Sequence, residues 1–181
     1  MANAAPVDDT KVKTPLTVVG VMMAMLFAFA VVPRLFTPPV SPFVGKDAPD
    51  FTLPVVLNGD GPRISLAELK GKPVLLDFWA TWCGPCQVEA PILNKVSQRF
   101  KDRGLVVIGV DVNEGPGLAG PWAKAHGITY PIAFDSEDVG QKYGVENLPT
   151  LILVSKEGKV LAVRTGVTSD SELERLVTAA L

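Results

Sequence analysis

The chemistry that this sequence could perform is concentrated in its two cysteines, Cys83 and Cys86, which Gly84 and Pro85 separate. The apolar run 74–78 ends just before them and a helical pattern begins just after them, so Cys83 stands where a buried strand gives way to a helix. The N-terminus of a helix offers unpaired N–H groups and a positive dipole end, which stabilise an anion such as a thiolate. We therefore expect Cys83 to be an exposed, nucleophilic thiol with a lowered pKa, and Cys86 to close a disulfide with it.

Two other uses of a cysteine pair are alternatives to redox chemistry. A structural zinc site needs about four ligands, and the chain has two cysteines and one histidine, His126, so it cannot assemble such a site by itself. A purely structural disulfide is possible, but a loop this short removes little entropy from the unfolded chain. The spacing at a strand-to-helix turn therefore favours a dithiol that cycles between reduced and oxidised forms.

The residues around the cysteines resemble a known active site. Residues 82–86 read Trp-Cys-Gly-Pro-Cys, as in the thioredoxins, and Asp77 stands where thioredoxins carry a buried acid, six residues before the first cysteine. Residues 148–150, Leu-Pro-Thr, resemble the cis-proline loop that faces the disulfide in that fold. Glu89 and Pro91 extend the match to Cys-x-x-Cys-x-x-Glu-x-Pro, the form typical of membrane-anchored thioredoxin-like proteins of the TlpA/ResA/DsbE type.

This resemblance, which covers about 43–181, implies an α/β thioredoxin fold. Its features would be a central mixed β-sheet flanked by helices, an N-terminal β-hairpin extension and an inserted strand–helix unit, preceded by one transmembrane helix. Ser65 is expected to cap a short helical turn at 66–69. The pattern predicts strands at 50–56, 63–66, 74–78, 105–110, 130–134, 151–154 and 160–163, and helices at 85–100, 121–126, 138–143 and 171–180.

The resemblance also implies roles for these residues. Cys83 would attack a partner disulfide, Cys86 would resolve the mixed disulfide, and Asp77 would take the proton of Cys86. Glu89 shares a helix face with Cys86, where a carboxylate would raise a cysteine pKa or help proton transfer, although an ordinary exposed helix acid is an equal alternative. The predicted substrate-binding residues are Trp82, Gly84, Pro85, Leu148 and Pro149, whose loop could pair with an extended substrate strand.

The N-terminal part indicates export. Residues 1–15 are small and polar and are expected to be disordered, whereas 16–32 form an uncharged apolar run near the lower length limit for a membrane-spanning helix. Lys11 and Lys13 before the run, against Arg34 after it, favour a cytoplasmic N-terminus. We expect an inner-membrane protein with a single span and its catalytic domain on the periplasmic or extracytoplasmic side.

Cleavage is the alternative to an anchor, because Ala28-Phe29-Ala30 fits a signal peptidase site and cleavage after Ala30 would release the domain into the same compartment. The proline-rich stretch 33–49 is expected to be an extended linker, and 50–181 the thioredoxin-like domain.

The function expected is that of an extracytoplasmic thiol:disulfide oxidoreductase. Gly84 and Pro85 resemble the reducing thioredoxins, so disulfides of exported proteins would be the substrates, with apocytochrome c as one candidate. By resemblance, electrons would come from a membrane thiol donor of the DsbD/CcdA type, and the protein would be a monomer without a bound cofactor or metal. A net charge of −2 gives no indication of a nucleic-acid partner.

Two other classes of function stay open. A peroxiredoxin shares the fold, and its peroxidatic cysteine normally follows a Pro-x-x-x-Thr pattern. This chain has no proline at the corresponding position before Thr81. A non-catalytic binding module or holdase is the other.

Overall fold

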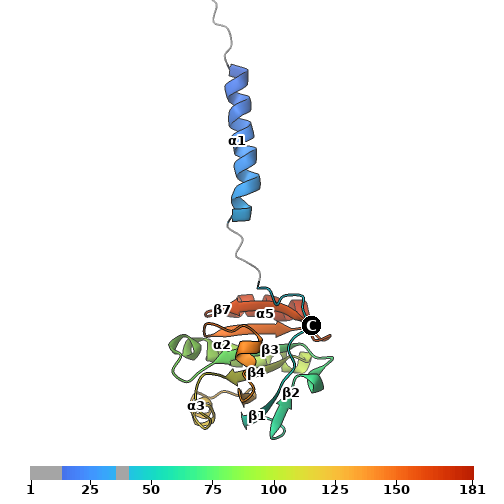
Figure 1. Ribbon diagram of the computed structural model, residues 1–181, viewed down its shortest axis with the longest axis vertical. Coiled ribbons are helices and arrows are strands. Elements are labelled where there is room, and N and C mark those ends of the chain that lie inside the picture. Colours follow the sequence, from blue (N-terminus) through green and yellow to red (C-terminus); the bar gives the residue numbers. More distant parts are fainter. Residues whose placement is uncertain (1–13, 36–40) are drawn as a thin grey trace, which may run out of the picture. The chain divides into compact units, whose positions relative to one another are not determined.

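The computed structural model describes residues 14–35 and 41–181, and the chain divides into two compact units, Met1–Val40 and Ser41–Leu181 (Figure 1). The described residues of the first unit form helix α1 (Thr14–Leu35), where the sequence predicted a membrane-spanning helix at 16–32. Among the described residues, no helix has the combined length and apolar character needed to traverse a bilayer. The disorder predicted for residues 1–13 and the linker at 36–40 fall outside the described residues.

The second unit is built on a mixed sheet of seven strands in the order β2-β1-β5-β4-β3-β6-β7 (Figure 1). Strands β3, β4 and β5 run parallel, and every other neighbouring pair is antiparallel. This is the mixed sheet that the sequence predicted, with the hairpin β1–β2 added at the β5 edge. The strands are β1 (Thr52–Leu57), β2 (Arg63–Ser65), β3 (Val74–Trp79), β4 (Val106–Asp111), β5 (Ile132–Phe134), β6 (Thr150–Val154) and β7 (Val160–Thr165).

Helices lie against both faces of the sheet, with a separate apolar core under each face. Helices α2, α3 and α5 contribute buried side chains to one core, while α4 and the segment before β1 contribute to the other. The extra strand–helix unit is present between β4 and β6, where the chain holds α3, β5 and α4. The helices are α2 (Gly84–Phe100), α3 (Ala119–Ala125), α4 (Val139–Lys142) and α5 (Asp170–Ala180), with short 3-10 turns η1 (Ala67–Leu69) and η2 (Lys101–Arg103).

Strand β3 is buried on both faces and positions the site. Successive side chains of a strand point to opposite faces. Leu75 and Trp79 belong to the core under α2, whereas Leu76 and Phe78 belong to the other core. The same alternation directs the side chain of Asp77 toward the α2 face.

The predicted linker is shorter than expected, because residues 41–49 are part of the folded unit. The N–H of Gly45 donates to the carbonyl of Val160 over 2.8 Å, and Asp47 forms an isolated bridge with Lys159. The apolar ring of Phe43 packs against the second core, so this stretch is held by burial as well as by backbone hydrogen bonds.

The predicted cap by Ser65 is wrong. Helix η1 begins after Leu66 with no side-chain hydrogen bond from its N-cap residue. A carboxylate oxygen of Asp50 instead accepts the N–H groups of Phe51 and Ala67, over 2.9 and 3.1 Å. A longer-range acceptor therefore replaces the local one.

Candidate active site

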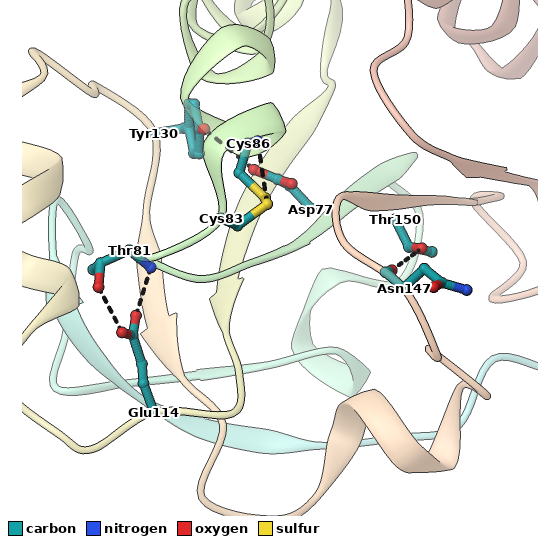
Figure 2. Close-up of a disulfide and its surroundings, with 8 residues drawn as sticks. All are labelled: Asp77, Thr81, Cys83, Cys86, Glu114, Tyr130, Asn147 and Thr150. Carbon is teal, nitrogen blue, oxygen red and sulfur yellow. Dashed lines mark hydrogen bonds between the residues drawn. A yellow bond between two sulfur atoms is a disulfide. The ribbon is translucent and has the colours of Figure 1, made fainter.

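The two cysteines form a disulfide at the N-terminus of α2, with an S–S distance of 2.03 Å (Figure 2). Cys83 is the N-cap residue of the helix, and its Sγ accepts a hydrogen bond from the N–H of Cys86 over 3.2 Å. The expectation that Cys83 would be exposed is wrong: Cys83 is 4 % exposed and Cys86 is 3 % exposed. What distinguishes the two sulfurs in this oxidised state is therefore their position relative to the helix terminus.

Asp77 is buried on the α2 side of β3, as the strand alternation requires. The hydroxyl of Tyr130 donates to Oδ2 of Asp77 over 3.4 Å, from the segment that leads into β5 (Figure 2). Burial, and then the charge of Glu89, raise the pKa of Asp77 well above its ordinary value, while the hydrogen bond from Tyr130 works in the opposite direction. Burial therefore favours the protonated form of Asp77 and makes this carboxyl a candidate for proton exchange with a thiol.

Glu89 is 1 % exposed, so the alternative of an ordinary exposed helix acid is wrong. Its Oε1 accepts the N–H of Thr168 over 2.7 Å, and its Oε2 has no hydrogen-bond partner among the described residues. Burial raises the pKa of Glu89 to about 7, against the lowering effect of the Thr168 hydrogen bonds. The helix thus carries a carboxyl one turn after Cys86 that is close to half ionised at neutral pH.

The cis-proline loop reaches the same end of the sheet as the cysteines. Phe78 of β3 is in register with Thr150 of β6, so the residues before Thr150 lie beside the carboxyl end of β3. The Leu148–Pro149 peptide bond is cis, as the resemblance implied. The Thr150 hydroxyl donates to the carbonyl of Asn147 over 2.7 Å, which holds the loop closed (Figure 2).

The predicted substrate-binding residues present both exposed and buried surface. Trp82 is 63 % exposed, Gly84 and Pro85 are also exposed, Leu148 is half-buried and Pro149 is buried. An aromatic side chain held in solvent beside a disulfide offers contact area to a partner chain. The contribution of each of these residues to substrate binding stays a prediction.

Four residues near the disulfide were not identified from the sequence: Tyr130, Thr81, Asp111 and Glu114. Tyr130 was read only as part of a strand, and nothing in its local pattern indicates a contact with Asp77. Asp111 did carry a signal, because it ends a buried strand that is parallel to β3 and residues at the carboxyl ends of neighbouring parallel strands gather at one edge. It was read instead as the start of a loop.

Comparisons with known proteins agree with this geometry. The model of the AhpC/TSA family matches residues 44–163. The chain is 38 % identical over 135 residues to the thiol-disulfide oxidoreductase ResA of Bacillus thuringiensis strain Al Hakam, which covers 72 % of this chain and 75 % of ResA. It is 35 % identical over 155 residues to ResA of Bacillus subtilis strain 168, covering 84 % and 85 % of the two chains.

A solved structure shows the same fold. The crystal structure of a protein described as a putative thiol:disulfide interchange protein DsbE, from Chlorobium tepidum, superposes with a TM-score of 0.69 at 34 % identity. The superposition covers 76 % of this chain and 96 % of that one. The paired cysteines, the buried acid behind them and these relatives lead to one conclusion: the chain belongs to the AhpC/TSA family and is a thioredoxin-like thiol:disulfide oxidoreductase of the TlpA/ResA/DsbE type.

Proposed function

We propose that the enzyme works outside the cytoplasm and reduces disulfides in exported proteins, with apocytochrome c as one candidate substrate. The observation that carries the reducing direction is the acidic environment of the disulfide. Asp77 and Glu89 are both buried on the α2 side of the sheet, which is also the side of Cys83 and Cys86.

The two carboxyl groups affect the reduction potential of the disulfide through the stability of the thiolate. A carboxylate disfavours a nearby thiolate, and a dithiol whose thiolate is poorly stabilised is a stronger reductant. Gly84 and Pro85 add neither charge nor a side-chain donor next to Cys83. The donor at Cys83 Sγ, the N–H of Cys86, is an uncharged backbone group. These features support a potential near that of the reducing thioredoxins, about −270 mV, rather than about −120 mV as in the strongly oxidising exported type.

In the catalytic cycle proposed, the thiolate of reduced Cys83 attacks a sulfur of the partner disulfide and forms a mixed disulfide. The partner's second sulfur leaves as a thiolate and takes up a proton. The ionised carboxylate of Asp77 then takes the proton of Cys86. The resulting Cys86 thiolate attacks Sγ of Cys83 and releases the reduced partner. The enzyme ends as the disulfide seen in this structure.

The location is part of the proposal. The uncharged run 16–32, with Lys11 and Lys13 before it, supports export of the domain. The run would serve either as an uncleaved anchor or as a signal peptide removed after Ala30. Because an exported reductase needs a supply of electrons, we propose a membrane thiol donor of the DsbD/CcdA type as its partner.

The direction is tested by equilibrating the full chain with glutathione buffers and measuring the fraction of the Cys83–Cys86 disulfide. We expect a midpoint close to −270 mV, and a midpoint close to −120 mV would make the enzyme a disulfide donor instead. Insulin reduction by dithiothreitol should accelerate in its presence. If the protein leaves the rate of insulin reduction unchanged, this would support the binding-module alternative. Rapid consumption of peroxide by the protein would support the peroxiredoxin alternative.

Substrate and location need separate measurements. A Cys86→Ser variant should retain partners as mixed disulfides through Cys83, and a Cys83→Ser/Cys86→Ser double variant is the matched control that should retain none. Protease treatment of spheroplasts should degrade the domain if it is exported. N-terminal sequencing of the mature protein then separates an anchor from a cleaved signal, and a protected domain would contradict the location.

A further inference from the structure

Thr81, two residues before Cys83, is held by a single carboxylate from a distant segment. Its backbone N–H donates to Oε1 of Glu114 over 2.8 Å, and its hydroxyl donates to Oε2 over 2.6 Å (Figure 2). Glu114 belongs to the segment that follows β4, 33 residues further along the chain. Hydrogen bonds to an ionised acceptor are stronger than those between neutral groups, and the paired geometry fixes orientation as well as distance.

The residue held in this way is the middle of the turn that delivers Cys83 to the helix. The N–H of Cys83 donates to the carbonyl of Ala80 over 3.1 Å, which closes a turn over Thr81 and Trp82. Trp82 is exposed, whereas the two hydrogen bonds from Thr81 to Glu114 connect this turn to a segment outside it.

Asp111 lies behind Glu114 and is fully buried at the end of β4. Neither of its carboxyl oxygens accepts a hydrogen bond from an N–H or O–H donor among the described residues. Glu114 acts on the pKa of Asp111, and two interacting carboxyl groups are favoured when one of them holds a proton.

The proton resides on Asp111. Burial, then the hydrogen bond and charge of Glu114, and then the charge of Asp135 raise the pKa of Asp111 to about 9. Burial would also raise the pKa of Glu114, but the hydrogen bonds with Asp111 and Thr81 outweigh it and hold this pKa below its ordinary value. Near neutral pH, Asp111 is therefore neutral and has a proton to donate, while Glu114 is ionised and can accept it.

We propose that Glu114 is a positioning residue for the nucleophile: it holds Thr81 and so keeps Cys83 at the N-terminus of α2, and Asp111 holds Glu114 in place by donating a hydrogen bond to it. Among the hydrogen bonds of the described residues, none joins either acid to a cysteine sulfur. Both act through the turn at Thr81. The inference rests on the thiol:disulfide exchange activity and is independent of its direction.

The consequence for reactivity follows from the helix terminus. The Cys83 thiolate is stabilised by the N–H groups and dipole at the start of α2 only while Sγ stays at the N-cap position. If the turn loosens, the thiolate loses this contact, the thiolate fraction near neutral pH falls, and the dithiol becomes more reducing.

The test compares Thr81→Val with Thr81→Ser in the full chain. Valine has the shape of threonine without the hydroxyl, whereas serine keeps the hydroxyl. In the reduced Thr81→Val variant, the rate of Cys83 alkylation by iodoacetamide at pH 6 to 7 should fall about threefold to tenfold, the range expected for loss of one hydrogen bond of ordinary net strength. The reduction potential should become more negative, and Thr81→Ser should match the parent in both measurements.

The role of Asp111 is tested by a second pair, Asp111→Asn and Asp111→Leu. The side-chain amide of asparagine donates to Glu114 as a protonated acid does, so this variant should match the parent, whereas leucine should reproduce the Thr81→Val result.

Unchanged alkylation and potential in Thr81→Val would overturn the proposal, even if that variant is less stable, because a purely structural contact predicts just that outcome. Equal behaviour of the two Asp111 variants would overturn the role of the donor. A failure of Asp111→Leu to fold leaves the Thr81 pair and Asp111→Asn to decide. The glutathione midpoint of the parent enzyme tests the direction of the reaction and does not enter these comparisons.

Discussion

The hydroxyl of Tyr130 hydrogen-bonds to Oδ2 of Asp77 across 3.4 Å, although 53 residues separate the two in the chain. Both groups are buried on the face of the sheet that α2 covers. Room for this contact comes from Gly109, because a Cβ at that position would lie 3.2 Å from Cε2 of Tyr130 and 2.6 Å from Cδ1 of Ile132. The proton affinity of the acid behind the disulfide is thus set partly by a side chain from another strand.

Tyr130→Phe should move the pH dependence of thiol:disulfide exchange upward. The hydrogen bond from Tyr130 favours the ionised form of Asp77, so its loss raises the pKa of Asp77 further and makes the ionised base rarer. We expect about a threefold to tenfold slower insulin reduction near pH 8, the effect of one hydrogen bond of ordinary net strength. Tyr143→Phe is the matched control, because it removes a buried hydroxyl that donates to the carbonyl of Pro49, on the other face of the sheet. Equal pH profiles for the two variants would contradict the role assigned to Tyr130.

Asp77→Asn should fold normally, resist unfolding better at alkaline pH, and exchange disulfides more slowly. The pKa of Asp77 is raised in the folded state, so its favourable contribution is complete below the ordinary value of 3.8 and is lost as the pH rises toward the folded pKa. The stability gained by the variant should therefore grow with pH. Urea unfolding between pH 5 and pH 9 measures this trend, with the exposed Asp102→Asn as control. An exchange rate equal to that of the parent over the same range would remove Asp77 from proton transfer.

Glu89→Gln should flatten the dependence of stability on pH. The pKa of Glu89 rises from 4.5 to about 7 on folding, so its contribution is present below pH 4.5 and is lost as the pH rises to about 7. At about 1.4 kcal/mol per pH unit, this interval corresponds to about 3 kcal/mol for the buried acid. Glutamine keeps an oxygen for the N–H of Thr168 without the charge, so the oxidised variant should be the more stable protein at pH 8.

The measurement for Glu89 is the urea midpoint of the oxidised protein at pH 4.5, 6 and 8. Glu146→Gln, at an exposed position, is the control that should follow the parent at every pH. A Glu89→Gln curve that runs parallel to that of the parent would mean that Glu89 does not change its charge over this range.

Reduced Cys83 should react with iodoacetamide faster than Cys86 at mildly acidic pH. Only Cys83 occupies the N-cap position of α2, where the helix terminus stabilises a thiolate. Cys86→Ser should therefore keep most of the alkylation rate and Cys83→Ser should lose it. Peptide mapping after partial labelling checks the order, and preferential labelling of Cys86 would reverse the assignment of attacking and resolving thiols.

Local sequence determined the chemistry and most of the elements. The spacing of Cys83 and Cys86 at a strand-to-helix transition predicted the disulfide, and the apolar runs predicted β3, β4 and the hairpin of β6 and β7 close to their observed bounds. Such features depend on neighbours a few residues apart, whose geometry is set by backbone periodicity. Asp77 was recognised because it stands six residues before the first cysteine, as in the thioredoxins, and because a carboxyl inside an apolar strand is costly unless it has a role.

The tertiary structure alone decided which residues share the site. Glu89 is buried because α2 packs against the sheet and the N–H of Thr168, before α5, meets its carboxylate, whereas its sequence allowed an exposed position equally well. Tyr130 reaches Asp77, and Glu114 reaches Thr81, through strand order and the paths of connecting segments. Contacts between residues dozens of positions apart leave no periodic trace in the sequence, because they depend on how strands are ordered rather than on how each one forms.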